Sequence, residues 1–347
     1  MSLSLIKRCL LLLTLLVMLV VSIYAWQLYK QFHKPLSNNI ETLPEFVDVN
    51  PGDGLYKVCQ RFNAMGLLQD TRSFCRIALW SGYDALKRGR YKVTETDSLF
   101  GLLDKMQKGD VMRFQVALIE GHSFKQMLER IWSNPNIKPI LQGASAEQIM
   151  KRVAGDNAPH PEGQFYPDTY YFSYGVSDIT VLKRSYKRLQ QILEEEWQQK
   201  SEDLPYKSPY EALIMASIVE KETGLASERP EIAAVFVSRL NKGMRLQTDP
   251  TVIYGLGDQY KGNITRRHLR QYTPYNTYRI NGLPPTPIAM VGRAAINAAL
   301  HPADTDALFF VAKGDGSHQF SKTLQEHNKA VREYQLTRKK NYRSAPK

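Results

Sequence analysis

The sequence predicts an α+β protein with a single apolar N-terminal helix, a small unit of strands and helices, and a larger mixed α/β domain. Three features carry this prediction: an apolar run near the N-terminus, a strand–helix–helix–strand pattern within residues 45–110, and a buried helix followed by a long segment rich in Pro, Gly and Tyr. The chain has 347 residues and is 43% hydrophobic and 23% charged. That length suffices for two packed domains and an anchor, and the composition is globular.

Shifts in composition along the chain predict its parts. They are a cytoplasmic tip and membrane anchor at 1–26, a polar stalk at 27–44, the small unit at 45–110, the larger domain at 111–337 and a basic tail at 338–347. The formal net charge is +12, which favours anionic partners such as nucleic acid, membrane headgroups or acidic cell-wall polymers. Part of this excess lies in the tail, which we expect to be solvated. The sequence has no motif for nucleic-acid recognition, so we expect no nucleic-acid partner.

The N-terminal run predicts an uncleaved membrane anchor. Lys7 and Arg8 precede a nearly unbroken apolar stretch over Cys9–Ala25, at the short end of what spans ~30 Å of hydrocarbon. A signal peptidase needs small residues in an A-x-A-like arrangement, and Ile23 interrupts that arrangement. Because almost nothing precedes the helix, we expect the N-terminus in the cytoplasm and the rest of the chain exported.

Turn and cap residues define the small unit. The predicted elements are a strand at 47–49, a helix from residue 55 closed by Gly66, a helix at 71–80, a strand at 90–93 and a helix from residue 99 that ends at Gly109. Cys59 and Cys75 would lie in a compartment that permits disulfides. Two small buried side chains are an equally good interpretation, so the sequence leaves their pairing open.

The larger domain is predicted in less detail. A strand at 116–119 leads through a Gly turn to a helix capped by Ser123, and the S-P-Y-E pattern at 208–211 begins a buried helix. Further elements are expected at 229–242, around 296–300 and at 323–336 as helices, and at 308–312 as a strand. The segment 247–288 is long and rich in Tyr, which favours an ordered functional surface.

Two carboxylates at the C-terminal end of the buried helix are the main candidates for chemistry. Glu220 and Glu222 directly follow its apolar stretch. Burial and the negative helix end both disfavour ionisation, so the pKa of such a carboxyl should be raised, as protonation of a glycosidic oxygen requires. Residues two apart on a helix differ by about 200°, so only one faces a given cleft, and the periodicity does not choose between them. The plain alternative is two solvent-facing side chains paired with Lys221 or Arg239.

The segment after this helix supplies side chains of the kind that bind sugars. Amides, a carboxylate and an aromatic ring are offered by Gln247, Asp249, Tyr254 and Asn276. The alternative is a surface loop ordered by its own Pro and Tyr packing. Glu162 is a further candidate for substrate binding, and Asp168 lies nearby; turn and cap chemistry is the simpler interpretation of both.

Several motifs occur in a fixed order along the chain: EG at 162–163, PDTY at 167–170, ASIVEKET at 216–223, LQTDPTVIYG at 246–255, YNTY at 275–278 and GLPP at 282–285. With them the sequence resembles the endolytic murein transglycosylases, also called the MltG or YceG-like family, over nearly its whole length. It departs from the family pattern at Thr286, where glycine is expected, and at Tyr166, where Phe or Trp is common.

The resemblance implies a bacterial inner-membrane enzyme with a periplasmic active domain, a LysM-like βααβ subdomain at 45–110 and a YceG-like catalytic domain at 111–337. It places the catalytic glutamate at Glu220. The family cleaves the β-1,4 bond between N-acetylmuramic acid and N-acetylglucosamine within glycan strands and leaves 1,6-anhydro ends, which would terminate the elongation of nascent strands. The implied partners are peptidoglycan strands and, by proximity, penicillin-binding proteins. We expect Gln247, Asp249 and Asn276 to orient the glycan or Glu220.

Other chemistries have less support in the sequence. No H-E-x-x-H or Cys-x-x-Cys pattern, no G-x-S-x-G elbow and no phosphate-binding Gly loop occurs in the sequence, so we expect neither a metal nor another cofactor. The non-enzymatic alternative is a membrane-tethered scaffold that binds peptidoglycan without cleaving it. A pure binder has no need for an acid in an apolar setting, so the carboxylates of the buried helix distinguish the two functions.

Overall fold

The computed structural model describes residues 3–36 and 43–336, and the expected basic tail lies outside them. The predicted mixed α/β character is confirmed, with helices accompanied by two-stranded sheets. The chain divides into two compact units, Met1–Phe114 with Tyr171–Tyr174 and Gln115–Tyr170 with Gly175–Lys347.

The N-terminal helix α1 (Leu3–His33) has the length and composition of a membrane-crossing segment. Within the stretch Leu10–His33, an 18-residue window has a mean hydropathy of 2.2, and the side chains are exposed from residue 10 to residue 27. Towards the end of the helix, Phe32 is buried and lies edge-on to Phe74, with ring centroids 5.0 Å apart. One end of α1 is therefore part of a folded core, while an apolar stretch long enough to cross a bilayer stays exposed.

The rest of the first unit follows the predicted order of strand, helix, helix and strand. Its elements are β1 (Phe46–Val49), α2 (Leu55–Ala64), α3 (Thr71–Trp80), β2 (Gly89–Lys92) and α4 (Leu99–Lys108). Strands β1 and β2 pair antiparallel, with Phe46 opposite Lys92. Gly109 ends α4 in the left-handed conformation, at φ 78°, as predicted for a helix C-terminus.

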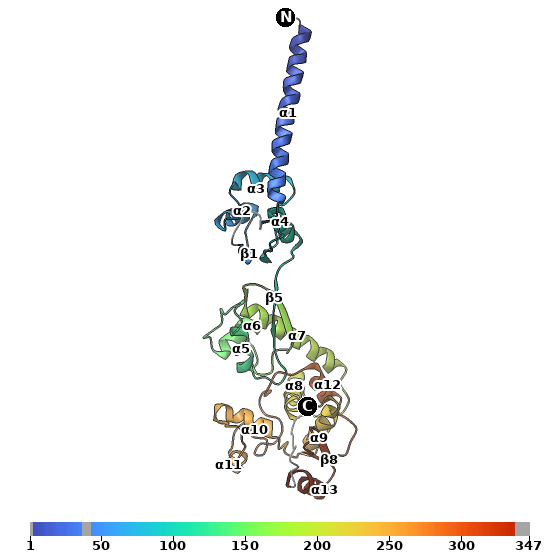
Figure 1. Ribbon diagram of the computed structural model, residues 1–347. Helices are drawn as coiled ribbons and strands as arrows, with labels where there is room; N and C mark the ends of the chain where they lie inside the picture. Colours follow the sequence, from blue (N-terminus) through green and yellow to red (C-terminus); the bar gives the residue numbers. More distant parts are fainter. Residues whose placement is uncertain (1–2, 37–42, 337–347) are drawn as a thin grey trace. The chain divides into compact units, whose positions relative to one another are not determined.

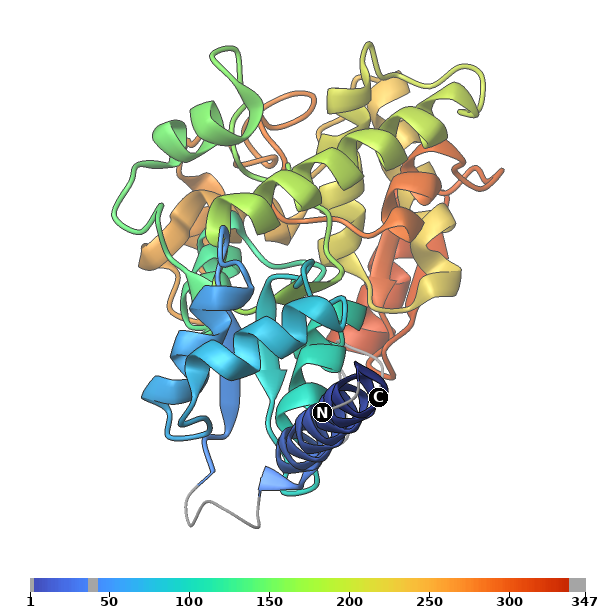
Figure 2. The same ribbon diagram turned by 90° about the horizontal axis from the view of Figure 1, so that it is seen from above.

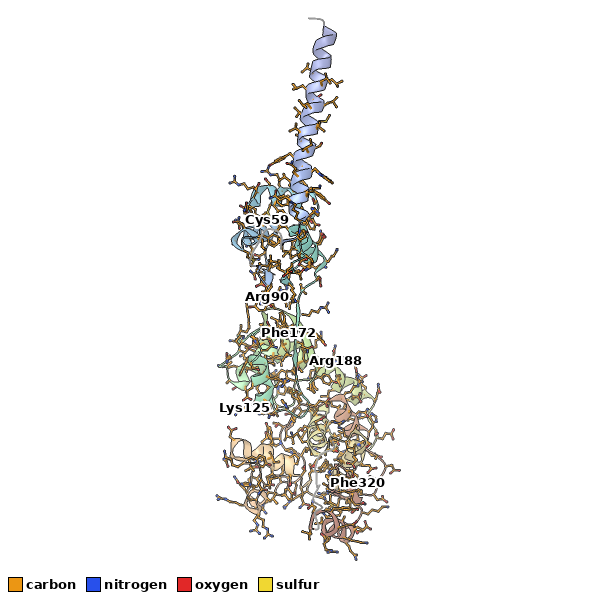
Figure 3. The ribbon with its side chains drawn as sticks, viewed as in Figure 1. Cys59, Arg90, Lys125, Phe172, Arg188 and Phe320 are labelled. Atoms are coloured by element: carbon orange, nitrogen blue, oxygen red, sulfur yellow. A yellow bond between two sulfur atoms is a disulfide. The ribbon has the colours of Figure 1, made fainter. Side chains whose placement is uncertain are left out.

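The two cysteines of this unit form a disulfide. Cys59 on α2 and Cys75 on α3 are joined, with their Cα atoms 6.2 Å apart, and Cys59 lies among the buried side chains of the unit (Figure 3). The pairing that the sequence left open is therefore present, and it fastens the two helices together.

The second unit is mainly helical. Its helices are α5 (Phe124–Trp132), α6 (Ala146–Ala154), α7 (Asp178–Gln198), α8 (Pro209–Glu222), α9 (Arg229–Asn241), α10 (Asp249–Leu256), α11 (Arg266–Arg270), α12 (Arg293–Leu300) and α13 (Leu324–Val331), the last continued by the π-helical turn η4 (Arg332–Leu336). Its own strands pair as β4 (Ile137–Lys138) with β6 (Val176–Ser177) and β7 (Phe309–Ala312) with β8 (His318–Ser321). Strand β3 (Arg113–Ala117) pairs with β5 (Thr169–Ser173), and each of these two strands has residues in both units.

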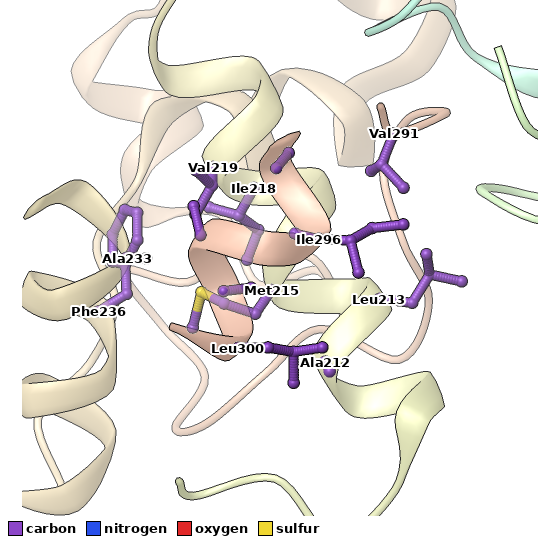
Figure 4. Close-up of a cluster of buried hydrophobic side chains, with 14 of the residues drawn as sticks. Ala212, Leu213, Met215, Ile218, Val219, Ala233, Phe236, Val291, Ile296 and Leu300 are labelled. Carbon is purple, nitrogen blue, oxygen red and sulfur yellow. The ribbon is translucent and has the colours of Figure 1, made fainter. Parts of the chain in front are cut away.

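Helix α8 is the centre of the second unit. Every residue from Ala212 to Val219 is buried, and α7, α9 and α12 pack around the helix (Figure 4). The long helix α7 runs along one side of this bundle (Figure 1, Figure 2). Burying each large aliphatic side chain contributes about 1.5–3 kcal/mol, so the bundle fixes the position of the α8 C-terminal end.

The structure differs from the sequence prediction mainly in the second unit. The sequence did not predict helices α6, α7, α10 and α11 or strands β4, β5, β6 and β8, and β3 begins three residues before the expected strand at 116–119. Part of 247–288 is helical, because Pro250 occupies the first turn of α10, where its missing N–H costs nothing. The Gly and Tyr content of the segment 247–288 favoured a loop, so this helix was not predicted.

Candidate active site

The end of α8 is defined by local caps. Ser208 accepts a hydrogen bond from the Glu211 N–H at 3.3 Å, whereas the Glu211 carboxylate accepts the Lys207 N–H at 2.6 Å rather than that of Ser208. Of the two reciprocal hydrogen bonds that an S-x-x-E pattern can form at a helix start, only the one accepted by Ser208 is therefore present. At the other end the helix stops at Glu222 and Thr223 is extended, so Glu220 and Glu222 leave the helix in different directions.

Glu222 faces a cavity of about 560 Å³. The Thr248 hydroxyl donates a hydrogen bond to its carboxylate. Burial raises the pKa of Glu222 to about 7, and the negative charge of Asp249 adds to this, while Thr248 and Arg239 act in the opposite direction. A carboxyl with this pKa holds its proton near neutral pH and can also release it, as an acid/base catalyst must.

Side chains around this cavity are held by contacts with the backbone and with each other. The Tyr278 hydroxyl donates to Asp249 Oδ1 at 2.8 Å. Arg239 is buried and donates to the carbonyl oxygens of Leu308 and Leu246, both at 2.7 Å. The guanidinium thus satisfies backbone acceptors, and among the described residues it forms no ion pair within 4.0 Å. This arrangement lets the pKa of Glu222 stay high although a cation lies nearby.

Gln247 reaches the same cavity through an unusual backbone conformation. Its φ is 52°, a left-handed value that is uncommon for a residue with a side chain. Its N–H donates to the Thr277 carbonyl at 3.2 Å, and the neighbouring Thr248 N–H donates to the Thr277 hydroxyl at 3.0 Å. The two segments that line the cavity are therefore joined, and Gln247 and Asp249 lie with Glu222 along its wall.

Glu220 has a different environment. Its side chain is 6% exposed, with Oε1 3.5 Å from Arg229 Nη2, and Oε2 accepts the Gly292 N–H at 3.2 Å. Burial raises the pKa of Glu220, as expected from the sequence, with Arg229 opposing this shift and Glu120 adding to it. Lys221, the alternative partner, instead donates to the Gly121 carbonyl at 3.0 Å. Glu220 is thus engaged by an ion pair and a backbone amide.

Glu162 and Tyr254 form a separate cluster. Glu162 is buried, and its carboxylate accepts the Phe124 N–H at 2.9 Å, at the start of α5, and the Tyr254 hydroxyl at 3.1 Å. Burial raises the pKa of Glu162 to about 7. Tyr254 packs edge-on against Tyr275, whose hydroxyl lies 2.9 Å from that of Thr286. These contacts make Glu162 a helix cap and a support for Tyr254, in line with its simpler interpretation.

Asn276 is an internal clamp. Its side chain is 1% exposed. Its Nδ2 donates to the carbonyls of His268, Leu269 and Gln271 at 3.1, 3.2 and 2.6 Å, and Oδ1 accepts the Tyr278 N–H at 3.0 Å. The amide is thus fully used within the protein. Asp168 accepts the N–H of the residue that follows it at 2.7 Å, which is turn chemistry.

The structure therefore separates the residues predicted to act together. Gln247 and Asp249 gather around Glu222, whereas Tyr254 pairs with Glu162 and Asn276 is internal. Three residues of this cavity were missed as candidates: Thr248, Tyr278 and Arg239. Thr248 and Tyr278 belong to the motifs LQTDPTVIYG and YNTY, so their position was a usable signal. Among the described residues, no group of three or more His, Cys, Asp or Glu side chains is placed to hold a metal ion.

Comparisons with known proteins identify the family of this chain. A family model described as the YceG-like family matches residues 47–333. The endolytic murein transglycosylase of Bacillus subtilis (strain 168) is 30% identical over 324 residues, which cover 88% of each chain. That of Streptococcus pneumoniae serotype 2 (strain D39 / NCTC 7466) is 24% identical over 323 residues, 83% of this chain and 58% of the pneumococcal protein.

A solved structure agrees with this assignment. The crystal structure of a yceG-like protein from Listeria monocytogenes matches with a TM-score of 0.51 and 31% identity, and the match covers 82% of this chain and 98% of the other. The order of motifs, the family model and the shared structure lead to one conclusion: the chain belongs to the YceG-like family.

Proposed function

We propose that this chain is an endolytic murein transglycosylase that cleaves the β-1,4 bond between N-acetylmuramic acid and N-acetylglucosamine within glycan strands and leaves 1,6-anhydro ends. The observation that carries the proposal is a carboxyl, Glu222, with a pKa of about 7 in a cavity of about 560 Å³ that Gln247 and Asp249 also line. The names of the Bacillus and Streptococcus relatives support the same activity.

The acid/base role moves from Glu220, where the resemblance placed it, to Glu222. Both carboxyls have raised pKa values, but the residues expected to orient the glycan lie beside Glu222. Glu220 is instead held by Arg229 and the Gly292 amide. Arg229 opposes the rise in the pKa of Glu220, and both oxygens of this carboxyl are already in contact with protein donors, so it is less free than Glu222 to approach a leaving oxygen.

The proposed reaction needs one carboxyl. Protonated Glu222 gives its proton to the bridging oxygen as the bond from C1 to that oxygen breaks. The resulting carboxylate takes the proton of the C6 hydroxyl of the same sugar, whose oxygen then bonds to C1 and closes the anhydro ring. An intramolecular nucleophile gains from proximity, so no activated water is required, unlike in two-carboxylate hydrolases. The negative charge of Asp249 favours the positive charge that develops at C1.

The proposed setting is the bacterial inner membrane. Helix α1 would be the single-pass anchor with its N-terminus in the cytoplasm, and the second unit would act in the periplasm on glycan strands, where cleavage ends their elongation. We further propose that the βααβ elements of the first unit act as a LysM-like glycan-binding subdomain and that the enzyme works close to penicillin-binding proteins.

Digestion of purified sacculi tests this function and separates the two glutamates. The full-length protein in detergent micelles should release muropeptides with anhydro ends, as measured by mass spectrometry. Glu222→Gln should abolish release, and Glu220→Gln should retain it. The reverse result would return the acid role to Glu220. Products that have gained water would indicate a hydrolase, and binding of sacculi without any cleavage would support the scaffold alternative.

A further inference from the structure

We propose that the second unit carries a binding site for the carboxylates of the acidic stem peptides of murein, separate from the cavity of Glu222. The site is a hollow of about 770 Å³ lined by Gln259, Arg267, His268, Arg270 and Gln271, called here the arginine hollow. This proposal extends the proposed function, since it names the part of the substrate that the hollow would bind.

The charge of the arginine hollow is not neutralised within the protein. Arg267 and Arg270 are exposed, and no carboxylate of the described residues lies within 4.0 Å of either guanidinium. The nearest acidic residue in sequence, Asp258, is paired with Lys125 at 3.3 Å. Guanidinium groups bind carboxylates through two parallel hydrogen bonds, and the amides of Gln259 and Gln271 can add further donors. The chemistry of the hollow therefore fits a carboxylate ligand.

Side-chain hydrogen bonds fix the backbone at both ends of α11, which carries the arginine hollow. The Thr265 side chain caps the start of α11, accepting the His268 N–H at 3.3 Å. At the other end, buried Asn276 binds three carbonyls of residues 268–271. A short exposed helix would ordinarily be marginal, and this clamp fixes the direction in which the arginines leave it. Pre-organisation lowers the entropy lost on binding.

The same contacts connect the arginine hollow to the cavity of Glu222. Asn276, which holds the hollow, also accepts the Tyr278 N–H, and the Tyr278 hydroxyl donates to Asp249. Asp249 begins α10, which packs against α11, and the two helices lie together in Figure 1. A glycan strand held at Glu222 would therefore have the arginine hollow beside it, on the neighbouring helix α11. A substituent that branches from the strand can reach the hollow there.

The stem peptide is the occupant that this chemistry favours. The sugars of a glycan strand are uncharged where the lactyl carboxyl is joined to the peptide by an amide bond, whereas the peptide bears free carboxylates. Neutral sugars need aromatic faces and amides rather than two arginines. A lipid surface would call for an apolar patch, and Tyr272 is the one large hydrophobic side chain between residues 257 and 272 that is strongly exposed, at 73%.

A substrate comparison tests the proposal. Uncrosslinked strands with their stem peptides, and the same strands with the peptide carboxylates amidated, are digested by the full-length protein in neutral detergent. Arg267→Gln with Arg270→Gln should lower kcat/KM on peptide-bearing strands by about tenfold, mainly through KM, as for the loss of charge-assisted hydrogen bonds. Activity on the amidated strands should not change. Arg266→Gln is the control, since it removes one positive charge from the same helix at a residue that does not line the hollow.

An equal loss on both substrates, or no loss on either, would overturn the proposal. A binding measurement keeps it independent of the proposed function. Full-length protein with Glu222→Gln should bind a free disaccharide pentapeptide by calorimetry, and should lose that binding in the double arginine variant or when the peptide carboxylates are amidated. Tighter binding of glycerol phosphate than of the muropeptide would assign the hollow to a lipid headgroup and reject the peptide. If wild type cleaves no strand, the proposed function fails while this measurement still decides the hollow.

Discussion

Glu220 and Glu222 lie two residues apart at the same helix end, and burial raises the pKa of both, yet their surroundings differ. Glu220 has a cation within 3.5 Å and a backbone amide on its other oxygen. Glu222 has a hydroxyl donor, a nearby carboxylate and a cavity. The difference teaches that a raised pKa alone does not mark a catalytic acid. The features that favour Glu222 in the proposed function are the open space beside its carboxyl and, among the described residues, the absence of an ion pair that would stabilise its charged form.

The largest expected effect comes from removing the acid itself. Glu222→Gln should lower the rate of strand cleavage by about 10²–10⁴-fold, the usual contribution of general acid–base catalysis. Glu220→Gln should lower it by less than about tenfold, because in the proposed function that carboxyl only holds Arg229 and the Gly292 amide. Initial rates of anhydro-muropeptide release check both, with circular dichroism to confirm folding. Equal losses in the two variants would remove the distinction between the glutamates.

Asp249→Asn should shift the pH profile of cleavage. The negative charge of Asp249 helps to raise the pKa of Glu222, so its removal lowers that pKa. The acid must be protonated to act, so the alkaline limb of kcat/KM should move to lower pH, with a loss of up to about tenfold at pH 8 for each pKa unit. Tyr278→Phe is the control, because it keeps the charge of Asp249 and removes only a hydrogen bond. An unshifted alkaline limb would show that Asp249 does not tune the acid.

Arg229→Gln should destabilise the protein by about 1–3 kcal/mol, since it leaves Glu220 buried without its cation. Arg229 lowers the pKa of Glu220, so the variant raises it further above the unfolded value. A carboxyl whose folded pKa is raised loses stability as pH rises through the interval between the two pKa values. The difference in thermal midpoint from wild type should therefore be larger at pH 8 than at pH 5. The same difference in thermal midpoint at both pH values would mean that Arg229 does not change the pKa of Glu220.

The smallest effect is expected at Glu162, the third buried carboxyl. Its pKa is raised from 4.5 to about 7, so the folded protein holds this proton more tightly than the unfolded chain does, and stability falls as pH rises between these values. Glu162→Gln imitates the protonated form and keeps an acceptor for the Phe124 N–H. Its change in unfolding free energy relative to wild type should be within about 1 kcal/mol at pH 5.5. At pH 8 the variant should compare more favourably with wild type, as urea titrations can show.

The sequence predicted most of the first unit and the location of the α8 carboxylates. Ser98 and Gly109 bound α4 where their cap chemistry places them, because such signals are local. The choice between Glu220 and Glu222 was not local. It depends on Thr248, Arg229 and Gly292, which the fold brings to α8 from later segments. The sequence likewise suggested that Asn276 binds sugar, because the partners of its side chain are set by the fold. In the structure its amide donates to three backbone carbonyl oxygens.

The burial of Phe32 at the end of α1 has a mechanical consequence. A transmembrane helix joined to its domain by a flexible linker would let that domain move through a wide volume. Here the last turn of the helix is itself packed into the first unit, and the Leu36 N–H donates to the Asp97 carbonyl at 2.8 Å. In the proposed membrane setting this rigid joint would hold the first unit at a set height above the bilayer. As the proposed glycan-binding subdomain, the first unit would then meet the glycan layer closest to the membrane.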